Sequence, residues 1–447
     1  MWKEKITDFR QAADYMAQVS ASGMAPGLDS IRRLTARLGN PQDTLPAVHI
    51  AGTNGKGSVL GFVSTILKCA GYRTGRYSSP AVFSDLEKIQ VNGRPISRAD
   101  YVRGLEAVRE AAEAMADTGY PYPTVFEVET ALAFWYFRER QCDIVVLETG
   151  LGGLEDATNV TENTIAAVIT SVSRDHTAIL GDTLAEIAAH KAGIIKNGCY
   201  VISAAQEREV MEVVERTCAE REASLTVADA ALAEHIRSGL ARQQFDYGGM
   251  RKLEIALAGR YQIENAVVAV EVIGVLRRIG YPVTEKMLRW GLLETKWPGR
   301  FTVLAKRPIF VIDGAHNADG AEKLKESVRF FFTNKRIVAI IGVLKDKDYE
   351  KIAELTAPLA AQIITVTPPG NRRAMPAYEL AEAVRRYNPN VTAADSLEEA
   401  VEMSYLLADG GSVILAYGSL SYLGKLAEIV ANKDRIRRDA HGRSGEN

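Results

Sequence analysis

The 447-residue sequence lacks the apolar run of about 18 residues that a membrane-spanning helix needs. Its first segment, MWKEKITDFRQAADYM, is charged and has no apolar core of the kind found in signal peptides. Cysteine is scarce, and the cysteines are too far apart to form a Cys-x-x-Cys pair (Cys69, Cys142, Cys199 and Cys218). We expect them to be reduced thiols. These absences predict a cytoplasmic protein that does not contact a membrane.

An excess of either charge is also absent. Lys and Arg together number 54, and Asp and Glu number 56, so no overall charge draws the chain toward nucleic acid. The hydrophobic fraction is 47% and the charged fraction is 25%, which is typical of a globular protein. From the length we expect two or three domains. We further expect a monomer whose partners are small molecules.

Short apolar stretches alternate with helical patterns along most of the chain. LPAVHIAG, CDIVVLETG and NTIAAVITSV predict buried strands, and segments with helical spacing of apolar residues lie between or after them. Continuous apolar strands separated by helices predict a parallel sheet that is covered on both faces. The stretch 205–256 is less regular and more polar, and we expect it to hold further strands and helices.

A domain boundary is predicted at the Trp-Pro-Gly sequence 297–299, which cannot continue a helix and is followed by a new alternation of strands and helices. We therefore predict an α/β protein. Its first domain, residues 1–296, would be a P-loop-type, doubly wound, mainly parallel sheet domain, followed by a linker at 297–300. A smaller Rossmann-like α/β domain is expected in 301–432, and residues 433–447 form a polar tail that is expected to fray.

The stretch GTNGKGS, from Gly52 to Ser58, lies between a predicted strand and a predicted amphipathic helix. Its spacing differs from the common phosphate loop G-x-x-x-x-G-K-[ST], because Gly57 separates Lys56 from Ser58. Successive backbone N–H groups and the helix start still point at one place, and the glycines let the backbone approach an anion. The loop is therefore predicted to bind phosphate groups, with Lys56 as a point charge.

Glu148 ends a predicted strand, where doubly wound sheets place their ligands. Phosphoryl transfer needs a divalent cation with oxygen ligands, so Glu148 is a candidate metal ligand. The flexible turn GLGGLEDATN follows, and Glu155 in place of a third glycine excludes a dinucleotide fingerprint. His176 follows another strand and is either a hydrogen-bonded structural residue or a ligand. Lys191, taken alone, is expected to be a solvated helix lysine.

Several motifs occur together in one order: GTNGKGS (52–58), SSP (78–80), FEVETALAF (126–134), LETGLGGLEDATN (147–159), DHT (175–177), KAGII (191–195), WPGR (297–300) and DGAHN (313–317). Over nearly the whole chain they resemble the folylpolyglutamate synthase/dihydrofolate synthase family of the Mur ligase superfamily. The resemblance implies an ATP-dependent ligase with Mg²⁺ and an active site between two domains. ATP would phosphorylate a carboxylate of dihydropteroate or of a folate, and the amine of L-glutamate would attack the acyl phosphate. Closure of the domains would exclude water.

The resemblance also implies residue roles. The ATP-binding residues are Gly52, Thr53, Asn54, Gly55, Lys56, Gly57, Ser58, Asn265, Arg300 and Asp313. The metal ligands are Ser79, Glu148, His176 and Lys191. The catalytic residues are Lys56, Lys191 and His316, and the substrate-binding residues are Phe126, Asp156 and Ser419. Lys191 matches a lysine that is carbamylated in this superfamily, which turns the amine into a carboxylate-like oxygen ligand suited to Mg²⁺. The first domain would bind ATP and the pterin, and the second would serve glutamate ligation.

The chain departs from the family pattern outside the phosphate and metal residues. Residues 81–82 are Ala-Val where His-Leu is usual, and residues 86–88 replace an Asn-Glu-Arg stretch. Residues 154–155 are Leu-Glu in place of Arg-Leu, and Tyr261 replaces a histidine. These differences bear on substrate contacts rather than on the reaction.

Two other functions are compatible with a phosphate loop. A peptidoglycan-precursor ligase of the same superfamily would add an amino acid to a UDP-sugar peptide. Such chains usually carry a UDP-binding domain before the loop, whereas only 51 residues precede Gly52 here. A catalytically inactive nucleotide-binding regulator would not need Lys56, Glu148, His176 and Lys191 intact. The sequence leaves open whether the acceptor is dihydropteroate, a folylpolyglutamate or both.

Overall fold

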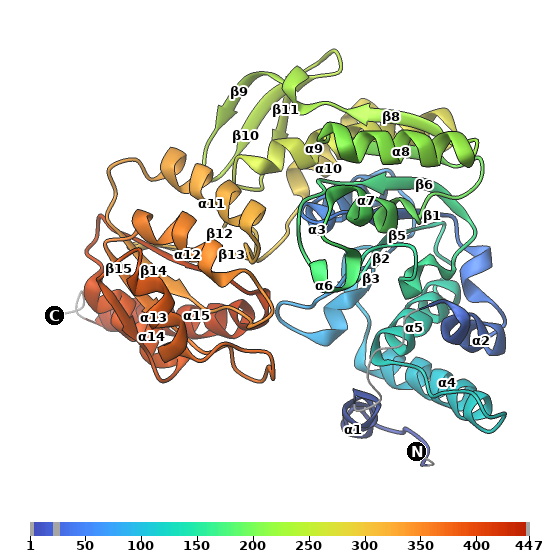
Figure 1. Cartoon of the computed structure of the whole chain (residues 1–447), viewed down its shortest axis with the longest axis horizontal. Helices are drawn as coiled ribbons and strands as arrows, with labels where there is room; N and C mark the ends of the chain where they lie inside the picture. Colours follow the sequence, from blue (N-terminus) through green and yellow to red (C-terminus); the bar gives the residue numbers. More distant parts are fainter. Residues whose placement is uncertain (1–3, 21–26, 444–447) are drawn as a thin grey trace.

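The computed structural model describes residues 4–20 and 27–443, which form two α/β bodies side by side (Figure 1). The first body, blue to yellow in Figure 1, contains an eight-stranded sheet and a small three-stranded sheet. The second body, orange to red, contains a six-stranded sheet. The two larger sheets are mainly parallel and have helices on both faces, which confirms the predicted fold class. Within the described ranges, no helix is long and apolar enough to cross a membrane.

The largest sheet has β1 at its topological switch point. In spatial order its strands are β4 (Arg94–Pro95), β3 (Ile89–Val91), β2 (Thr74–Tyr77), β5 (Ile144–Glu148), β1 (Ala47–Ala51), β6 (Thr164–Ile169), β7 (Tyr200–Ala204) and β8 (Ser224–Ala228). The strands from β2 to β8 in this order run parallel, whereas β3 and β4 form an antiparallel edge. Because β1 pairs with β5 on one side and β6 on the other, the loops after these three strands meet at one edge.

Helices cover both faces of this sheet because side chains alternate along its strands. Val48 and Ile50 face a core formed with α3 (Lys56–Cys69), α9 (Tyr261–Arg278) and α10 (Glu285–Glu294). Ala47 and Tyr77 face the opposite core. Four helices build that core: α1 (Phe9–Val19), α2 (Asp29–Arg37), α4 (Arg98–Ala116) and α5 (Val125–Glu139). Three more helices follow β6 and β7: α6 (Thr177–Leu180), α7 (Leu184–Ala192) and α8 (Arg208–Glu220).

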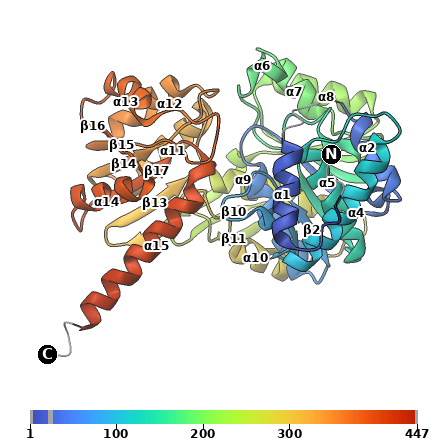
Figure 2. The same ribbon diagram turned by 90° about the horizontal axis from the view of Figure 1, so that it is seen from below.

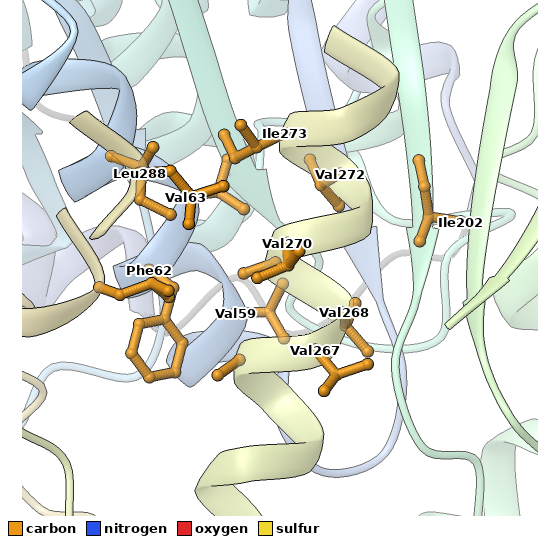
Figure 3. Close-up of a cluster of buried hydrophobic side chains, with 14 of the residues drawn as sticks. Val59, Phe62, Val63, Ile202, Val267, Val268, Val270, Val272, Ile273 and Leu288 are labelled. Atoms are coloured by element: carbon orange, nitrogen blue, oxygen red, sulfur yellow. The ribbon is translucent and has the colours of Figure 1, made fainter. Parts of the chain in front are cut away.

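The position of α3, which begins inside the predicted phosphate loop, is fixed by close packing. Figure 3 shows Val59, Phe62 and Val63 of α3 beside the valines of α9. On its other side α3 meets Gly291 of α10, where an added Cβ would lie 2.4 Å from the Cα of Ile66. The backbones of the two helices are therefore in direct contact at this point, and only a glycine fits.

The middle of the chain, expected to hold less regular strands and helices, contains α8, β8 and a small antiparallel sheet. The strands of this sheet are β11 (Met250–Ile255), β10 (Gln243–Tyr247) and β9 (Glu234–Ser238). Phe245, Leu253 and Ile255 belong to the same core as α9. The small sheet is thus an extension of the first body.

The second body repeats the doubly wound plan on a smaller scale. Its strands, in spatial order, are β12 (Thr302–Lys306), β13 (Ile309–Asp313), β17 (Val413–Tyr417), β14 (Ile337–Ile341), β15 (Gln362–Thr365) and β16 (Val391–Ala393). Only β12 is antiparallel to its neighbour. The helices are α11 (Ala318–Phe331), α12 (Tyr349–Thr356) and α13 (Ala377–Arg385) on one face, and α14 (Leu397–Leu407) and α15 (Leu420–Arg443) on the other.

Residues 433–443 are helical where a fraying tail was predicted for 433–447, and residues 444–447 lie outside the described ranges. The helical residues continue α15, which leaves the second body as a long rod in Figure 2. The first turns of α15 are anchored by Tyr422, Leu423 and Leu426 in the core. Once a helix is nucleated, each further residue adds one hydrogen bond, so polar residues can extend it.

Replacing Gly291 with alanine is expected to lower the free energy of unfolding by about 1–3 kcal/mol, because the new methyl group must displace the backbone of α3. Urea unfolding measures this change. Gly274→Ala is the matched control, since Gly274 lies inside α9 with nothing within 4 Å of its added Cβ. That substitution is expected to stabilise the protein by about 0.5–1 kcal/mol. Equal effects at both positions would contradict the packing argument.

Candidate active site

A cavity of about 880 Å³ lies between the two bodies, lined by loops that follow β1, β2, β5 and β6 in the first and β13 and β17 in the second. It brings together most of the predicted site residues: Gly52, Thr53, Asn54, Gly55, Lys56, Gly57, Ser58, Ser79, Glu148, His176, Lys191, Asn265, Arg300, Asp313 and His316. Phe126, Asp156 and Ser419 were also predicted, and they do not line it.

The loop from Gly52 to Ser58 joins β1 to α3, so its backbone N–H groups face the cavity at a helix start. Gly55 caps the helix with a φ of 90°, a conformation that favours glycine. A Cβ there would also lie 2.4 Å from Oδ1 of Asn265. The hydroxyl of Thr170, at the end of β6, donates a hydrogen bond to the carbonyl of Asn54 at 2.7 Å. Neighbouring elements thus hold the loop in one shape.

Lys56 lies over this loop. Its amine donates to the carbonyl oxygens of Gly52 at 3.0 Å and Thr53 at 3.2 Å. Burial lowers the pKa of Lys56, and the carboxylates of Glu148 and Asp175 act in the opposite direction. The amine therefore sits at the centre of the loop, next to the acidic groups of the site, where a phosphate would be in reach.

Glu148 is buried at the end of β5. Burial raises its pKa to about 7, while Lys56, Arg300 and the backbone N–H of Ser79 favour the carboxylate. Glu148 and the Ser79 hydroxyl are hard oxygen donors beside the phosphate loop, and Mg²⁺ typically takes one or two protein oxygens plus substrate phosphates. The residues therefore fit Mg²⁺ bound together with a nucleotide. Among the described residues, no cluster of three or more His, Cys, Asp or Glu side chains could hold a metal alone.

Asp175 joins the two bodies, a role that the sequence analysis did not assign. Its Oδ1 accepts from the amine of Lys347 at 2.6 Å, and its Oδ2 accepts from Nδ2 of Asn317 at 2.9 Å. Burial alone would raise the pKa of Asp175, but Lys347, His176 and His316 hold it well below its usual range. Because the folded pKa is lowered, this contact stabilises the protein above the ordinary carboxyl pKa of about 3.9 and is lost as the pH falls toward the folded value.

The phosphate loop itself also contacts the second body. Nδ2 of Asn54 donates to Oδ1 of Asn317 at 3.1 Å and to Oδ2 of Asp319 at 2.7 Å. Asn317 caps the N-terminus of α11, because its Oδ1 accepts a hydrogen bond from the backbone N–H of Gly320. The start of α11 is thereby positioned against the start of α3.

The two predicted histidines differ in how their rings are used. Nδ1 of His316 lies 2.7 Å from the carbonyl of Gly314 and must donate to it, so Nε2 of the neutral ring keeps a lone pair. Burial lowers the pKa of His316 to about 4, which keeps the ring neutral near pH 7. Nε2 of His176 accepts from Lys347 at 3.2 Å. A metal at Nε2 of His176 would need Lys347 to move.

Lys191 is buried, which corrects the expectation of a solvated helix lysine. The residue is 3% exposed, and within the described part of the chain its side chain makes no hydrogen bond or ion pair. Burial lowers its pKa to about 7, and the charge of Lys56 acts in the same direction. A substantial fraction of this amine is therefore neutral near pH 7. The sequence could not reveal this burial, because α7 places Lys191 on its inner face only when the turn at 150–153 packs over it.

Asp313 organises the second body's part of the site. Its carboxylate accepts from the Tyr261 hydroxyl at 2.6 Å and from the backbone N–H groups of Phe301 and Ala315, each at 2.8 Å. These bonds fix the linker end and the start of the loop that carries His316. Arg300 lies against the same loop, since a Cβ on Gly314 would overlap its Nη1.

The three predicted residues outside the cavity support its walls. Asp156 uses its carboxylate to accept from Leu151 N at 2.8 Å and from the Thr158 hydroxyl at 2.5 Å, so it shapes the glycine turn. The ring of Phe126 packs on Gly150 of that turn. Ser419 is buried and exchanges a hydrogen bond with the hydroxyl of Ser421.

One end of the cavity is largely apolar, although Asp229 and Ser238 also lie there. Its walls come from β7, β8, the small sheet and α9, and they include Ala204, Ala228, Ala230, Ile236, Ile263 and Val268. Asn265 lies between this end and the phosphate loop. Its amide donates to Gln262 at 3.0 Å and leaves its oxygen facing Gly55.

Comparison with known proteins gives matches along almost the whole chain. Residues 50–273 match the Mur ligase middle domain, and residues 299–420 match the Mur ligase glutamate ligase domain. The chain is 37% identical to a Bacillus subtilis protein named dihydrofolate synthase/folylpolyglutamate synthase, over 80% of this chain and 85% of that protein.

Solved structures with a similar fold include Mycobacterium tuberculosis folylpolyglutamate synthase complexed with ADP. That structure has a TM-score of 0.88 and 30% identity, and the match covers 96% of this chain and 99% of the other. Escherichia coli FolC in complex with DHPP and ADP has a TM-score of 0.83 and 27% identity, with 98% and 100% of the chains covered. The resemblance carried by the sequence motifs thus extends to the complete fold.

Lys347→Met is expected to destabilise the folded protein by about 3–5 kcal/mol, because the buried Asp175 loses the cation that compensates its charge. The side chain of Lys347 is 7% exposed and that of Asp175 is 9% exposed, so solvent does not replace the lost contact. Turnover should fall in parallel, since the pair joins the two halves of the cavity. Urea unfolding and an activity assay measure the two effects.

Lys351→Met is the matched control. Lys351 lies nearby on α12, is 44% exposed and, among the described residues, pairs only with Glu354. Its loss should change the free energy of unfolding by less than about 0.5 kcal/mol. If the two methionine variants behaved alike, the assignment of Lys347 as the interdomain contact would be wrong.

Proposed function

Because the chain belongs to the folylpolyglutamate synthase/dihydrofolate synthase family of Mur ligases, we propose that it is an ATP-dependent ligase that joins L-glutamate to dihydropteroate, to a reduced folate or to both. One observation carries the proposal. A single cavity contains a phosphate loop, two oxygen donors suited to Mg²⁺ and a neutral histidine from the opposite body.

Binding of ATP is supported by two features of the cavity. The phosphates would meet the N–H groups at the start of α3 and the amine of Lys56, and the base would enter the apolar end beside Asn265. Glu148 and Ser79 would hold Mg²⁺, which supplies charge neutralisation for the phosphates when bound.

In the first chemical step, an oxygen of the acceptor carboxylate attacks the γ-phosphorus of ATP. The bond from that phosphorus to the β–γ bridging oxygen breaks, and ADP leaves. Lys56 and Arg300 lie where they would stabilise the charge that moves onto the phosphates. The product is an acyl phosphate, which converts a poor acyl donor into a reactive one.

In the second step, the amine of L-glutamate attacks the acyl carbon and inorganic phosphate leaves. The ammonium group must first lose a proton to solvent, and Nε2 of His316 has the lone pair that would then accept a hydrogen bond from the amine and orient it. The contacts of Asp175 and Asn54 with the second body would keep the cavity closed, so that water does not hydrolyse the acyl phosphate.

We extend the proposal to the arrangement of the chain. Residues 1–296 would bind ATP and the pterin, residues 297–300 would act as the linker, and residues 301–432 would form the glutamate-ligase domain. One chain supplies both sides of the cavity, which supports a monomer as the active form. All four cysteines are unpaired, which supports a cytoplasmic location.

An activity panel tests the function. We expect phosphate release that requires ATP, Mg²⁺, L-glutamate and either dihydropteroate or tetrahydrofolate, with mass spectrometry showing the added glutamate. ATP hydrolysis without an acceptor should be slow, because the carboxylate is the nucleophile. Rapid hydrolysis without an acceptor, or activity only with a UDP-sugar peptide, would contradict the proposal.

Lys56→Ala provides the inactive control for this panel. Loss of one contact to the transferring phosphate should reduce turnover by the equivalent of about 2.7–4 kcal/mol. Lys68→Ala, at the exposed end of the same helix, should leave turnover unchanged. These two variants separate a role in catalysis from a general effect of removing a lysine.

Lys191 is proposed to be carbamylated and, with His176, to serve as a ligand of a second Mg²⁺. Its buried amine with a pKa of about 7 supports this, since only a neutral amine reacts with CO₂. The nitrogen forms a bond to the carbon of CO₂ and releases one proton. The negative carbamate would lie near the charge of Lys56. His176 would become available when Lys347 moves away from its Nε2.

We expect Lys191→Ala to be inactive and to be partly rescued by a short carboxylic acid, whereas Lys191→Arg should remain inactive. The yield of carbamate should rise with pH through about 7, where the amine loses its proton. Carbon-13 NMR with labelled bicarbonate measures the carbamate directly and independently of activity. Rescue of the alanine variant by small amines instead of acids would show that Lys191 acts as a cation.

A further inference from the structure

A second, smaller cavity of about 270 Å³ adjoins the first. The two share Gly57, Ser79, Pro80, Glu148, Arg300 and Leu420 in their walls. The smaller cavity extends from these residues under the linker, between Trp297 and the edge strands of the large sheet. A ligand bound beside Glu148 could therefore extend directly into the smaller cavity. None of the steps described above uses that space.

Arg76, on β2, is the cation that belongs to the small cavity alone. Its guanidinium lies 4.9 Å from the ring centre of Trp297. Within the described residues it makes no hydrogen bond or ion pair, and its buried Nε has no partner. Burial lowers its pKa to about 10, so the group is still charged near pH 7. A half-buried cation without a counter-ion is costly unless an anion joins it.

The two carboxylates whose charges act on Arg76 form hydrogen bonds with other groups. An oxygen of Glu87 accepts from the backbone N–H groups of Val82 at 2.5 Å and Phe83 at 3.1 Å. Glu148 accepts a hydrogen bond from the backbone N–H of Ser79 and faces the phosphate loop. Neither forms an ion pair with Arg76, although both lie near enough to stabilise its charge. The guanidinium fork is therefore free to bind a planar anion, and carboxylates match its geometry.

We propose that the small cavity binds the non-reacting carboxylate of a folyl acceptor through Arg76. The inference rests on the proposed function, which places the reacting carboxylate beside Lys56 and Glu148. A folyl acceptor ends in a glutamate that carries two carboxylates on one short chain, and only one of them is phosphorylated. The second carboxylate would then enter the small cavity and pair with Arg76, whose guanidinium lies against Trp297. Dihydropteroate ends in a single carboxylate and makes no such contact.

This assignment separates the two acceptor classes physically. A folyl acceptor gains a charge-assisted contact that dihydropteroate lacks, so Arg76 favours glutamate addition to a folate that already carries glutamate. The phosphates of ATP do not compete for Arg76, because the N–H groups of the phosphate loop face the larger cavity. Arg76 is thus a specificity residue for the second carboxylate of the acceptor.

The test combines a protein variant with a substrate analogue. Tetrahydrofolate is compared with an analogue in which 4-aminobutyrate replaces the terminal glutamate, so that only the non-reacting carboxylate is missing. For the unmodified enzyme, we expect the analogue to have a KM about tenfold higher. In Arg76→Gln the two KM values should be equal, and the KM for dihydropteroate should not change. Arg76→Lys should retain part of the difference, because it keeps the charge without the fork.

Arg73→Gln is the matched control. Arg73 lies just before β2, is exposed and bonds to the carbonyl of Arg140, so its loss should preserve the tenfold ratio. Equal KM values for the two folyl substrates in the unmodified enzyme would overturn the inference, even if the variant failed to fold. An equal loss with dihydropteroate and tetrahydrofolate in Arg76→Gln would show that Arg76 only supports the structure. If the unmodified enzyme used none of these acceptors, the proposed function itself would be wrong.

Discussion

The ion pair between Asp175 and Lys347 connects the two halves of the site. Asp175 follows β6, beside the phosphate loop, whereas Lys347 follows β14 in the second body. Because both side chains are buried, the pair is favourable only when the bodies are close enough for the charges to meet. Asn317 and Asn54 continue the same contact to the phosphate loop. The shape of the main cavity therefore depends on an interaction between residues that are far apart in the sequence.

Burial gives the charged groups of the site their chemical character. Glu148 has a raised pKa, and Lys56 and Lys191 have lowered ones, because each lies where water is largely excluded. Charges in such a place interact more strongly with a phosphate than they would in water. Desolvation of these groups is unfavourable in the protein alone. Bound substrates would supply the counter-charges that offset it. Arg76 in the adjoining cavity follows the same logic with a carboxylate.

The fold could be predicted, and the phosphate loop could be proposed, because their signals are local. Gly52 to Ser58 stand between one strand and one helix, and Glu148 stands at the end of another strand. Lys191 was expected to be solvated but is buried, and no sequence pattern pointed to Lys347 or Arg76. Asp156 was expected to contact the substrate, but its carboxylate accepts hydrogen bonds from Leu151 and Thr158. In each case the missing information was the neighbour of the side chain in space.

The amino-acid sequence by itself determined which segments become strands and helices, and it placed a glycine-rich loop between a strand and a helix. These features depend on the spacing of apolar residues and on glycines within a few positions of one another. The tertiary structure alone decided that Lys347 meets Asp175, that Lys191 is buried and that Arg76 lies against the ring of Trp297. Those facts depend on how two sheets and their loops pack together. No local pattern encodes them, because each arises from the sum of many contacts between distant parts of the chain.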